Sequence, residues 1–291
     1  MANSIALFQK YIALLDEVYK QSALSSDLDG DSTLVRAGAN TNEIIIPKME
    51  LDGLADYSRN GGYVKGNVSI TYETVKFNYD RGRKFDVDNM DNEETAGLAF
   101  GRLSGEFLRA KVVPEMDAFR FATYAGTEGI SKVETGATLT TGEEVLAAIL
   151  AAVNKMDEDE VPQEGRILYI TPTLYNLAVN VDTTKSKAIL DGFSKIVKVP
   201  QSRFYTAIDL MDGAAEDELA GGFTKNAAAK DINFMIVHKS AILQYPKHTV
   251  NKIVTPEANQ ESDGWLFFYR AYGLADVYEN KTAGIYLHHK A

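Results

Sequence analysis

One stretch of the chain, DNMDNEETAGLAFGRLSGEFLRAKVVPEMDAFRFATYAG at residues 88–126, constrains the fold more than any other. Its apolar residues recur at steps of three or four, the spacing of one helix face. They are Ala96, Phe100, Leu103, Phe107, Ala110, Val113, Met116 and Phe119. Asp91 and Glu94 have the spacing of a capping box at its start. At 1.5 Å per residue such a helix is about 50 Å long, whereas the average globular helix has about 11 residues. We therefore expect the fold to be built around one long helix.

Two features inside this helix bear on how it is used. Pro114 has no N–H group, so it removes one bond of the helical ladder and predicts a kink that can act as a flex point. Gly97, Gly101 and Gly105 lie four residues apart on one face and form a smooth strip that another backbone can approach closely. Local packing within the subunit would explain these glycines equally well.

Composition excludes several classes of protein. The chain has 291 residues, of which 45% are hydrophobic and 24% charged, which is typical of one to three folded domains. It contains no cysteine, which excludes disulfides, thiolate metal sites and cysteine nucleophiles. A net charge of −11 is the wrong sign for gripping nucleic acid. The local cluster of Arg81, Arg83 and Lys84 is flanked by acids, and we interpret it as a solvated strand end.

The first twenty residues predict an amphipathic helix. Apolar residues recur at helical spacing among polar ones and do not form the continuous core of a signal peptide. They are Leu7, Phe8, Ile12, Leu15 and Val18. No apolar run approaches the ~18 residues that a membrane span needs. We expect a soluble protein made and used inside a cell, without a membrane partner.

Residues 43–86 predict an extended β-hairpin with a mobile tip. EIIIPKMEL (43–51) and VSITYETVKFNYD (68–80) have strand character, and the segment between them is loop-like. The alternation of the second strand slips by one residue at Glu73-Thr74, which predicts a bulge. A two-stranded ribbon with few large apolar residues is marginally stable alone. It must therefore lie on another surface.

The second half mixes helices and strands. Residues 141–156 predict a helix capped by Thr141, residues 166–172 a buried strand, and residues 173–180 a short helix. Further strands are predicted in 195–211 and 231–245. This mixture of helices and strands predicts a compact α/β domain across 130–245. Strand character returns in 248–258 and 264–289, and we expect these strands to pack with the long helix.

Sites for chemistry are scarce. Asp27, Asp29 and Asp31 alternate as at the start of a calcium loop, but the sixth and twelfth positions hold Ser32 and Gly38 where a glycine and a glutamate are needed. We interpret this stretch as part of a solvated polar arm, with a calcium site as the less favoured alternative.

The histidines give no clearer signal. His238, His248, His288 and His289 lack the spacing of metal ligands, and the terminal pair reads as an exposed tail. No nucleotide-binding or hydrolase motif is present. We therefore predict no catalytic, cofactor-binding or metal-binding residues, no cofactor and no enzyme activity.

The order of these parts, together with the tract GRLSGEFLRAKVVPEMDAFRF in the long helix, resembles the major capsid protein of tailed bacteriophages. That fold is shared with encapsulin nanocompartments and herpesvirus capsid floors. The resemblance implies an α+β fold with an N-terminal arm (1–42), an extended hairpin loop (43–86), a peripheral domain (87–129 and 246–291) containing the long helix as its spine, and a compact α/β axial domain (130–245).

The resemblance also implies a function. The chain would be a structural subunit that self-assembles through pentamers and hexamers into an icosahedral head shell, present in the virion and in the host cytoplasm during assembly. The shell would enclose double-stranded DNA without sequence-specific binding. Since only about 40 residues precede the hairpin, too few for a further domain, we expect a separate scaffolding protein as a partner, besides the portal and a decoration protein. Some members of the family carry a covalent bond between a loop lysine and an asparagine of a neighbour, for which Lys65 and Asn280 are candidates.

Two other functions stay open. One is an encapsulin-type shell that encloses a cargo enzyme. The other is a soluble α/β enzyme or binding protein with an acidic cleft. Packaged DNA or packaged enzyme would separate the first two, and particle mass would separate both from the third.

Overall fold

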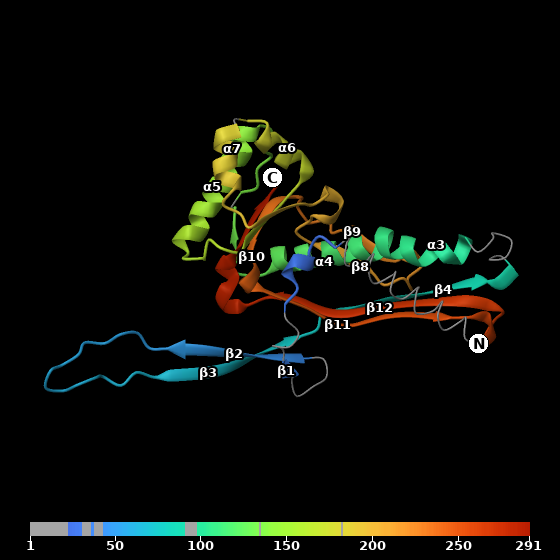
Figure 1. Cartoon of the computed structure of the whole chain (residues 1–291), viewed down its shortest axis with the longest axis horizontal. Coiled ribbons are helices and arrows are strands. Elements are labelled where there is room, and N and C mark those ends of the chain that lie inside the picture. Colours follow the sequence, from blue (N-terminus) through green and yellow to red (C-terminus); the bar gives the residue numbers. More distant parts are fainter. Residues whose placement is uncertain (1–22, 31–35, 38–42, 91–97, 134, 182) are drawn as a thin grey trace.

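The computed structural model describes residues 23–30, 36–37, 43–90, 98–133, 135–181 and 183–291. It has three parts (Figure 1): an α/β unit at one end of the long helix, a sheet that runs along the helix, and a ribbon that projects away from both. The mixed α+β class predicted from the sequence is confirmed. The expected N-terminal helix and the Asp91–Glu94 capping box lie outside the described residues.

The long helix runs through three consecutive elements. They are α3 (Leu98–Phe107), the π segment η3 (Leu108–Val112) and α4 (Val113–Gly126). The π segment ends at Val112. Pro114 follows two residues later, in the first turn of α4. Because proline cannot donate to the ladder, the preceding turn takes up the wider hydrogen-bond spacing of a π-bulge. The predicted irregularity is therefore a change of hydrogen-bond pattern one turn before the proline.

The helix contributes to two separate cores. Phe121, Tyr124 and Ala125 are buried against the α/β unit. Leu108 and Met116 are buried against the sheet that runs along the helix. The helix thereby joins the two parts, which is why its apolar stripe is continuous in the sequence.

The α/β unit is built on a mixed five-stranded sheet of order β5-β13-β10-β6-β7. Its strands are β5 (Ser131–Lys132), β13 (Ile285–His289), β10 (Ile232–His238), β6 (Arg166–Ile170) and β7 (Lys195–Lys198). The outer face is covered by α5 (Gly142–Glu158), α6 (Pro172–Val179) and α7 (Thr183–Leu190), and the other face packs on α4. Thr141 caps α5 as predicted, since its hydroxyl accepts from the Glu144 N–H at 3.3 Å.

A three-stranded sheet runs along the long helix (Figure 1). It consists of β11 (Ile242–Val254), β12 (Gly264–Val277) and β4 (Tyr79–Asp88). The predicted return of the C-terminal strands to the long helix is confirmed for β11 and β12. β13 instead joins the α/β sheet, between β5 and β10. His288 is therefore buried inside a sheet, and its reading as part of an exposed tail was wrong.

The ribbon is a hairpin of β2 (Glu43–Leu51) and β3 (Val68–Lys76), with the short β1 (Arg36–Ala37) beside β2. β2 and β3 pair in one unbroken register, so the predicted bulge at Glu73-Thr74 was wrong. The change of phase arises because the apolar residues change faces along the unbroken strand: Ile70 and Tyr72 lie on one face and are exposed, whereas Val75 lies on the other face and is buried. The chain leaves this sheet after Lys76 and enters the next one at Tyr79. Asn78 fixes the crossing, since its amide donates to the Ala275 carbonyl at 2.7 Å and accepts from the Ala275 N–H at 3.1 Å.

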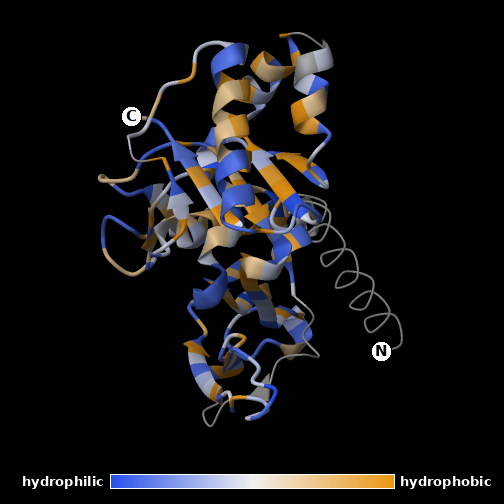
Figure 2. Ribbon diagram, turned by 90° about the vertical axis from the view of Figure 1, so that its left-hand side faces the viewer, coloured by the Kyte–Doolittle hydropathy of each residue, from blue (hydrophilic) through white to orange (hydrophobic). Residues whose placement is uncertain are grey.

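The remaining elements are short. A small two-stranded sheet of β8 (Ile208–Met211) and β9 (Gly222–Lys225) lies beside the long helix. The 3-10 turns are η1 (Ser26–Leu28), η4 (Gln201–Arg203), η5 (Lys239–Ala241), η6 (Pro256–Ala258) and η7 (Glu279–Gly284). Figure 2 shows hydrophobic residues on the strands of the α/β unit and again on the hairpin, which has no layer of structure over it.

Candidate assembly surface

The hairpin carries an apolar face that no other part of the described chain covers. Three cross-strand pairs form this hairpin face: Pro47 with Tyr72, Met49 with Ile70, and Leu51 with Val68. All six residues are exposed, and the five large ones are each more than half exposed. Exposed apolar patches of this kind mark interaction surfaces, and a free two-stranded ribbon is marginally stable in water. The hairpin face therefore requires a partner.

The hairpin tip, residues 52–67, is held by its own contacts. The Asp52 carboxylate accepts from the Asn67 N–H at 2.6 Å, and the rings of Tyr57 and Tyr63 lie 4.9 Å apart. Leu54 nevertheless projects fully into solvent. The tip is thus a shaped element whose apolar side chains point outward.

The root of the hairpin is anchored to the body. Ile44 and Val75 are buried against Leu243 of β11 and Leu274 of β12. Lys48 forms ion pairs with Glu73, at 3.1 Å, and with Glu279 of η7. The hairpin therefore leaves the body in a defined direction.

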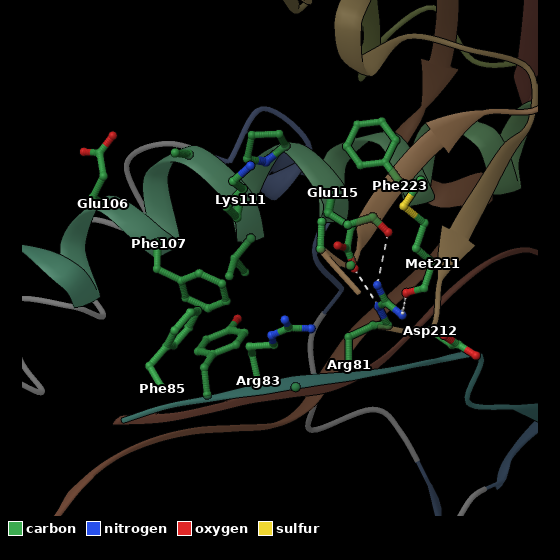
Figure 3. Close-up of a pocket in the computed structure, with 18 of the residues that line it drawn as sticks. Arg81, Arg83, Phe85, Glu106, Phe107, Lys111, Glu115, Met211, Asp212 and Phe223 are labelled. Atoms are coloured by element: carbon green, nitrogen blue, oxygen red, sulfur yellow. Dashed lines mark hydrogen bonds and ion pairs between the residues drawn. The ribbon is translucent and has the colours of Figure 1, made fainter. Parts of the chain in front are cut away.

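A cavity of about 700 Å³ lies beneath the long helix (Figure 3). The helix forms its roof, β4 and β12 its floor, and the β8–β9 sheet its side wall. Five of its lining residues are aromatic, and the rings of Phe85 and Phe107 lie 4.7 Å apart, edge to face. The other three are Tyr79, Phe223 and Tyr269.

Two arginines of β4 hold the side wall of this cavity. Arg81 donates to the Glu115 carboxylate at 2.7 Å and to the carbonyls of Met211 (2.7 Å) and Gly222 (3.2 Å). Burial lowers the pKa of Arg81, but its hydrogen bond to Glu115 and the charges of its acidic neighbours together outweigh this and leave the pKa raised. The interpretation of Arg81 as part of a solvated strand end was therefore wrong.

The other members of that basic cluster are more exposed. Lys84 pairs with Glu261 at 2.9 Å on the outer surface. Arg83 donates to the Leu219 carbonyl at 2.9 Å, and within the described part of the chain it has no carboxylate partner. Its charge is directed into the cavity (Figure 3).

The second half of the long helix also anchors the N-terminal segment. The buried Asp117 carboxylate accepts from the backbone N–H groups of Leu24 and Ser25 at 3.2 and 3.1 Å, and from the Ser25 hydroxyl at 2.7 Å. Arg203 reaches the same carboxylate at 3.3 Å, and Arg120 donates to the Ser25 hydroxyl at 2.8 Å. Residues 23–30 are thus bound into the core.

This anchor corrects the expectation of a solvated arm for these residues. Gln244 donates to the Ser25 carbonyl at 2.9 Å and to the Asp29 carboxylate at 2.5 Å, while Asp27 pairs with Lys195 at 2.6 Å. Asp31 lies outside the described residues. Sequence reasoning missed the anchor, although one signal was available: the tract VVPEMDAFRF places charged residues in an otherwise apolar stretch.

Other residues singled out in the sequence are scattered. The His238 ring contacts Ser240 at 2.7 Å and the Glu164 carbonyl at 2.9 Å, and His289 contacts its own neighbour Lys290. Across the residues that the structure describes, no group of three histidines or acids could hold a metal ion. Among the described helices, none is long and apolar enough to cross a membrane.

The candidate cross-linking residues lie at opposite ends of the hairpin. Lys65 is exposed at the tip, whereas Asn280 lies in η7 beside the root. A bond between them would join two chains, but neither their spacing nor their context in the sequence singles them out for it. Of the predicted glycine strip, Gly97 lies outside the described residues, and Gly105 faces open space.

No protein-family model matches the sequence, and no curated protein matches it closely. Solved structures do match. The chain is similar to Gordonia phage Cozz (TM-score 0.61, 14% identity, 93% of this chain and 87% of that one). It is also similar to the mature capsid of bacteriophage PhiM1 (TM-score 0.57, 11% identity, 88% and 84%). The chain has a phage capsid fold.

The same capsid fold occurs outside phages. A virus-like particle from Pyrococcus furiosus matches with a TM-score of 0.58 at 13% identity, over 97% of this chain and 99% of that one. At these identities the likeness establishes the fold, and the surfaces described above must carry the functional argument.

Proposed function

We propose that the chain is a structural subunit that self-assembles into a closed icosahedral shell, as the major capsid protein of a tailed bacteriophage. The hairpin face carries this proposal, because six apolar residues on one side of a projecting ribbon have no partner in the subunit. The phage capsid fold supports it, since the mature capsid of PhiM1 is among the matches. The subunit would act in the virion, would have no enzyme activity, and would need no cofactor.

Within this proposal the parts have separate roles. We keep the division into arm (1–42), extended loop (43–86), peripheral domain (87–129 and 246–291) and axial domain (130–245), with two exchanges of strands. β4 pairs with the peripheral strand β12, and β13 pairs inside the axial sheet. Both exchanges hydrogen-bond one part to another.

Assembly would proceed by contacts between unlike patches, which close into the pentamers and hexamers of a shell. Arms and hairpins lying over neighbours would together bury on the order of 2,000–5,000 Å² per subunit. A separate scaffolding protein, the portal and a decoration protein would be the further partners. With a net charge of −11, the inner wall would enclose double-stranded DNA without gripping it.

Negative-stain microscopy of the purified protein, with mass measurement, tests the proposal. We expect closed particles in the megadalton range, or capsomers of five or six chains. A protein that stays monomeric at all concentrations, with or without a scaffolding protein, would contradict it and would favour the soluble α/β enzyme or binding protein.

A second shell function has its own support. The match to the Pyrococcus virus-like particle covers nearly the whole of both chains, so this chain needs no element beyond those of that particle. An encapsulin-type compartment would hold a cargo enzyme. Nuclease-protected DNA inside purified particles would favour the phage head, and a co-purifying enzyme would favour the compartment.

A further inference from the structure

Two surfaces of the subunit complement each other but lie too far apart to meet within one chain. The cavity beneath the long helix presents aromatic side chains and the unpaired charge of Arg83. The hairpin tip presents the segment LDGLADY, residues 51–57, with Leu54 fully exposed. We propose that the tip of one copy inserts Leu54 and Asp56 into the cavity of a second copy, where Asp56 pairs with Arg83. The inference rests on the proposed shell function and names the site that receives the hairpin.

The size and lining of the cavity fit such an insertion. Its volume of about 700 Å³ lies within the roughly 300–1,000 Å³ that is typical of ligand sites. Leu219, next to the lining residue Ala220, is more than half exposed, so this part of the lining lies at the protein surface. An apolar side chain that enters between Phe107 and Phe223 would be removed from water, and so would the surfaces of the two rings that it contacts.

The lining carries three bases and three acids, and Arg83 is the base whose charge, directed into the cavity, points to an acidic partner. Arg81 is neutralised by Glu115, and the Asp212 carboxylate accepts from the N–H groups of Ala214 and Ala215. Among the described residues, Arg83 has the Leu219 carbonyl as its one acceptor, so several of its N–H donors remain available there. A carboxylate is the ligand that matches a guanidinium fork.

The tip supplies that carboxylate next to an apolar anchor. Asp56 is exposed and, within the described residues, makes no hydrogen bond or ion pair. Asp52, by contrast, is used to close the tip onto Asn67. Asp56 and Leu54 are two residues apart, close enough for one short segment to place both at the same site.

The occupant must come from another copy of the chain. In Figure 1 the hairpin runs away from the body on the side opposite α3, whereas the cavity lies beneath α3 and α4. A contact from tip to cavity joins unlike patches, so each subunit offers one tip and one cavity. Repeated around an axis, that arrangement closes into a ring.

Cysteine pairing tests the contact directly, because the chain contains no cysteine. Subunits with Leu54→Cys are co-assembled with subunits carrying either Ala110→Cys on the helix wall or Ala220→Cys on the β8–β9 wall, and then oxidised mildly. We expect a disulfide-linked dimer of one tip variant and one wall variant with at least one wall position, since a disulfide needs Cα atoms within about 7 Å. Leu150→Cys, exposed on α5, is the matched control and should give no dimer.

Particles that form without any such dimer at either wall would overturn the inference and leave the shell function intact. Failure of the unmodified chain to form particles would instead count against the shell function. The two outcomes are thus separate.

Charge reversal tests the pairing itself. Arg83→Asp and Asp56→Arg should each lower particle yield at least tenfold, and the two changes in one chain should restore it. Arg59→Asp, an exposed tip charge with no described partner, should assemble normally. Normal assembly of either single variant, or a double variant no better than the singles, would contradict the pairing. Thermal unfolding of each purified subunit, unchanged from that of the original, excludes misfolding as the cause.

Discussion

The hairpin and the five-stranded sheet both contain many apolar residues, but the sheet buries them and the hairpin exposes them. In β6 all five residues are buried, and in β10 six of seven are buried. In the hairpin, by contrast, the strand residues farthest from the root are exposed. Among the described residues, nine exposed large hydrophobic side chains lie between Met49 and Tyr72 and four lie elsewhere, so the exposure is concentrated in the hairpin. Folding is secured by the α/β unit, and the hairpin is left for contact with other molecules.

Removing the apolar character of the hairpin face gives the largest expected effect. The triple variant Met49→Thr, Val68→Thr, Ile70→Thr keeps β-propensity but loses side chains that each contribute roughly 1.5–3 kcal/mol when fully buried. We expect no particles in micrographs, while the thermal unfolding of the subunit changes little because these side chains are exposed in it.

Two controls sharpen that comparison. Ser69→Thr with Thr71→Ser, on the opposite face of the ribbon, should assemble normally. Phe234→Ala in β10 should show the reverse pattern, lowering the free energy of unfolding by about 3–5 kcal/mol. If the triple variant assembles as the original does, the hairpin face is not an assembly surface.

The N-terminal anchor is the next largest effect. Asp117→Ala leaves the N–H groups of Leu24 and Ser25 and the charge of Arg203 without their buried acceptor. We expect the free energy of unfolding, measured in urea, to fall by about 3–5 kcal/mol. Limited proteolysis should then cut near residue 23 before the rest of the chain.

Asp191→Ala is the matched control, since Asp191 is exposed and its carboxylate has no partner in the described part of the chain. It should change the free energy of unfolding by less than about 0.5 kcal/mol. Equal stability of the two variants would mean that the buried network does not hold the N-terminal segment.

Whether a feature of the fold could be predicted from the sequence depends on how far apart its interacting residues lie in the chain. The long helix, the Thr141 cap and the buried strand at 166–170 rest on neighbours a few residues apart, and periodicity predicted them. The Asp117 network joins residues about ninety positions apart, and β13 pairs with β10 across the chain. No local pattern carries such pairings. The cavity likewise exists only where β4, the helix and the β8–β9 wall meet.

The α/β unit contains a buried histidine, His288, that makes its stability depend on pH, whereas the hairpin contains no histidine. Burial, with a smaller contribution from the charge of His289, lowers the pKa of His288 from 6.5 to about 4. Its ring stacks on Phe234 at 4.9 Å and contacts the Asn233 amide at 3.0 Å. Between pH 6.5 and 4 the unfolded chain binds a proton that the native sheet does not. The stability that His288 provides is therefore complete above pH 6.5 and lost as the pH falls toward 4, by up to about 3 kcal/mol.

Urea unfolding at pH 7 and pH 4.5 measures this loss. His288→Gln should remove most of the difference, while His248→Gln, exposed on β11, should leave it unchanged. Because neither strand of the hairpin contains a histidine, this loss should be confined to the α/β unit. An identical pH dependence in the original and in His288→Gln would contradict the assignment.

The smallest effect is expected at Pro114, in the long helix that packs on both the α/β unit and the β11–β12–β4 sheet. A proline in a regular helix interior costs about 3 kcal/mol relative to alanine, but the π segment before Pro114 already accommodates its missing N–H. Pro114→Ala should therefore change the free energy of unfolding by less than about 1 kcal/mol. It should also let residues 108–112 return to α-helical bonding, visible by cryo-microscopy as a shift of α3 relative to α4. If the spine flexes here as shells expand, the temperature of particle expansion, followed by light scattering, will rise in Pro114→Ala and stay constant in Lys111→Ala, which retains the proline. Unchanged expansion in both variants would place the flexing elsewhere, at the Asn78 crossing between the hairpin and the body.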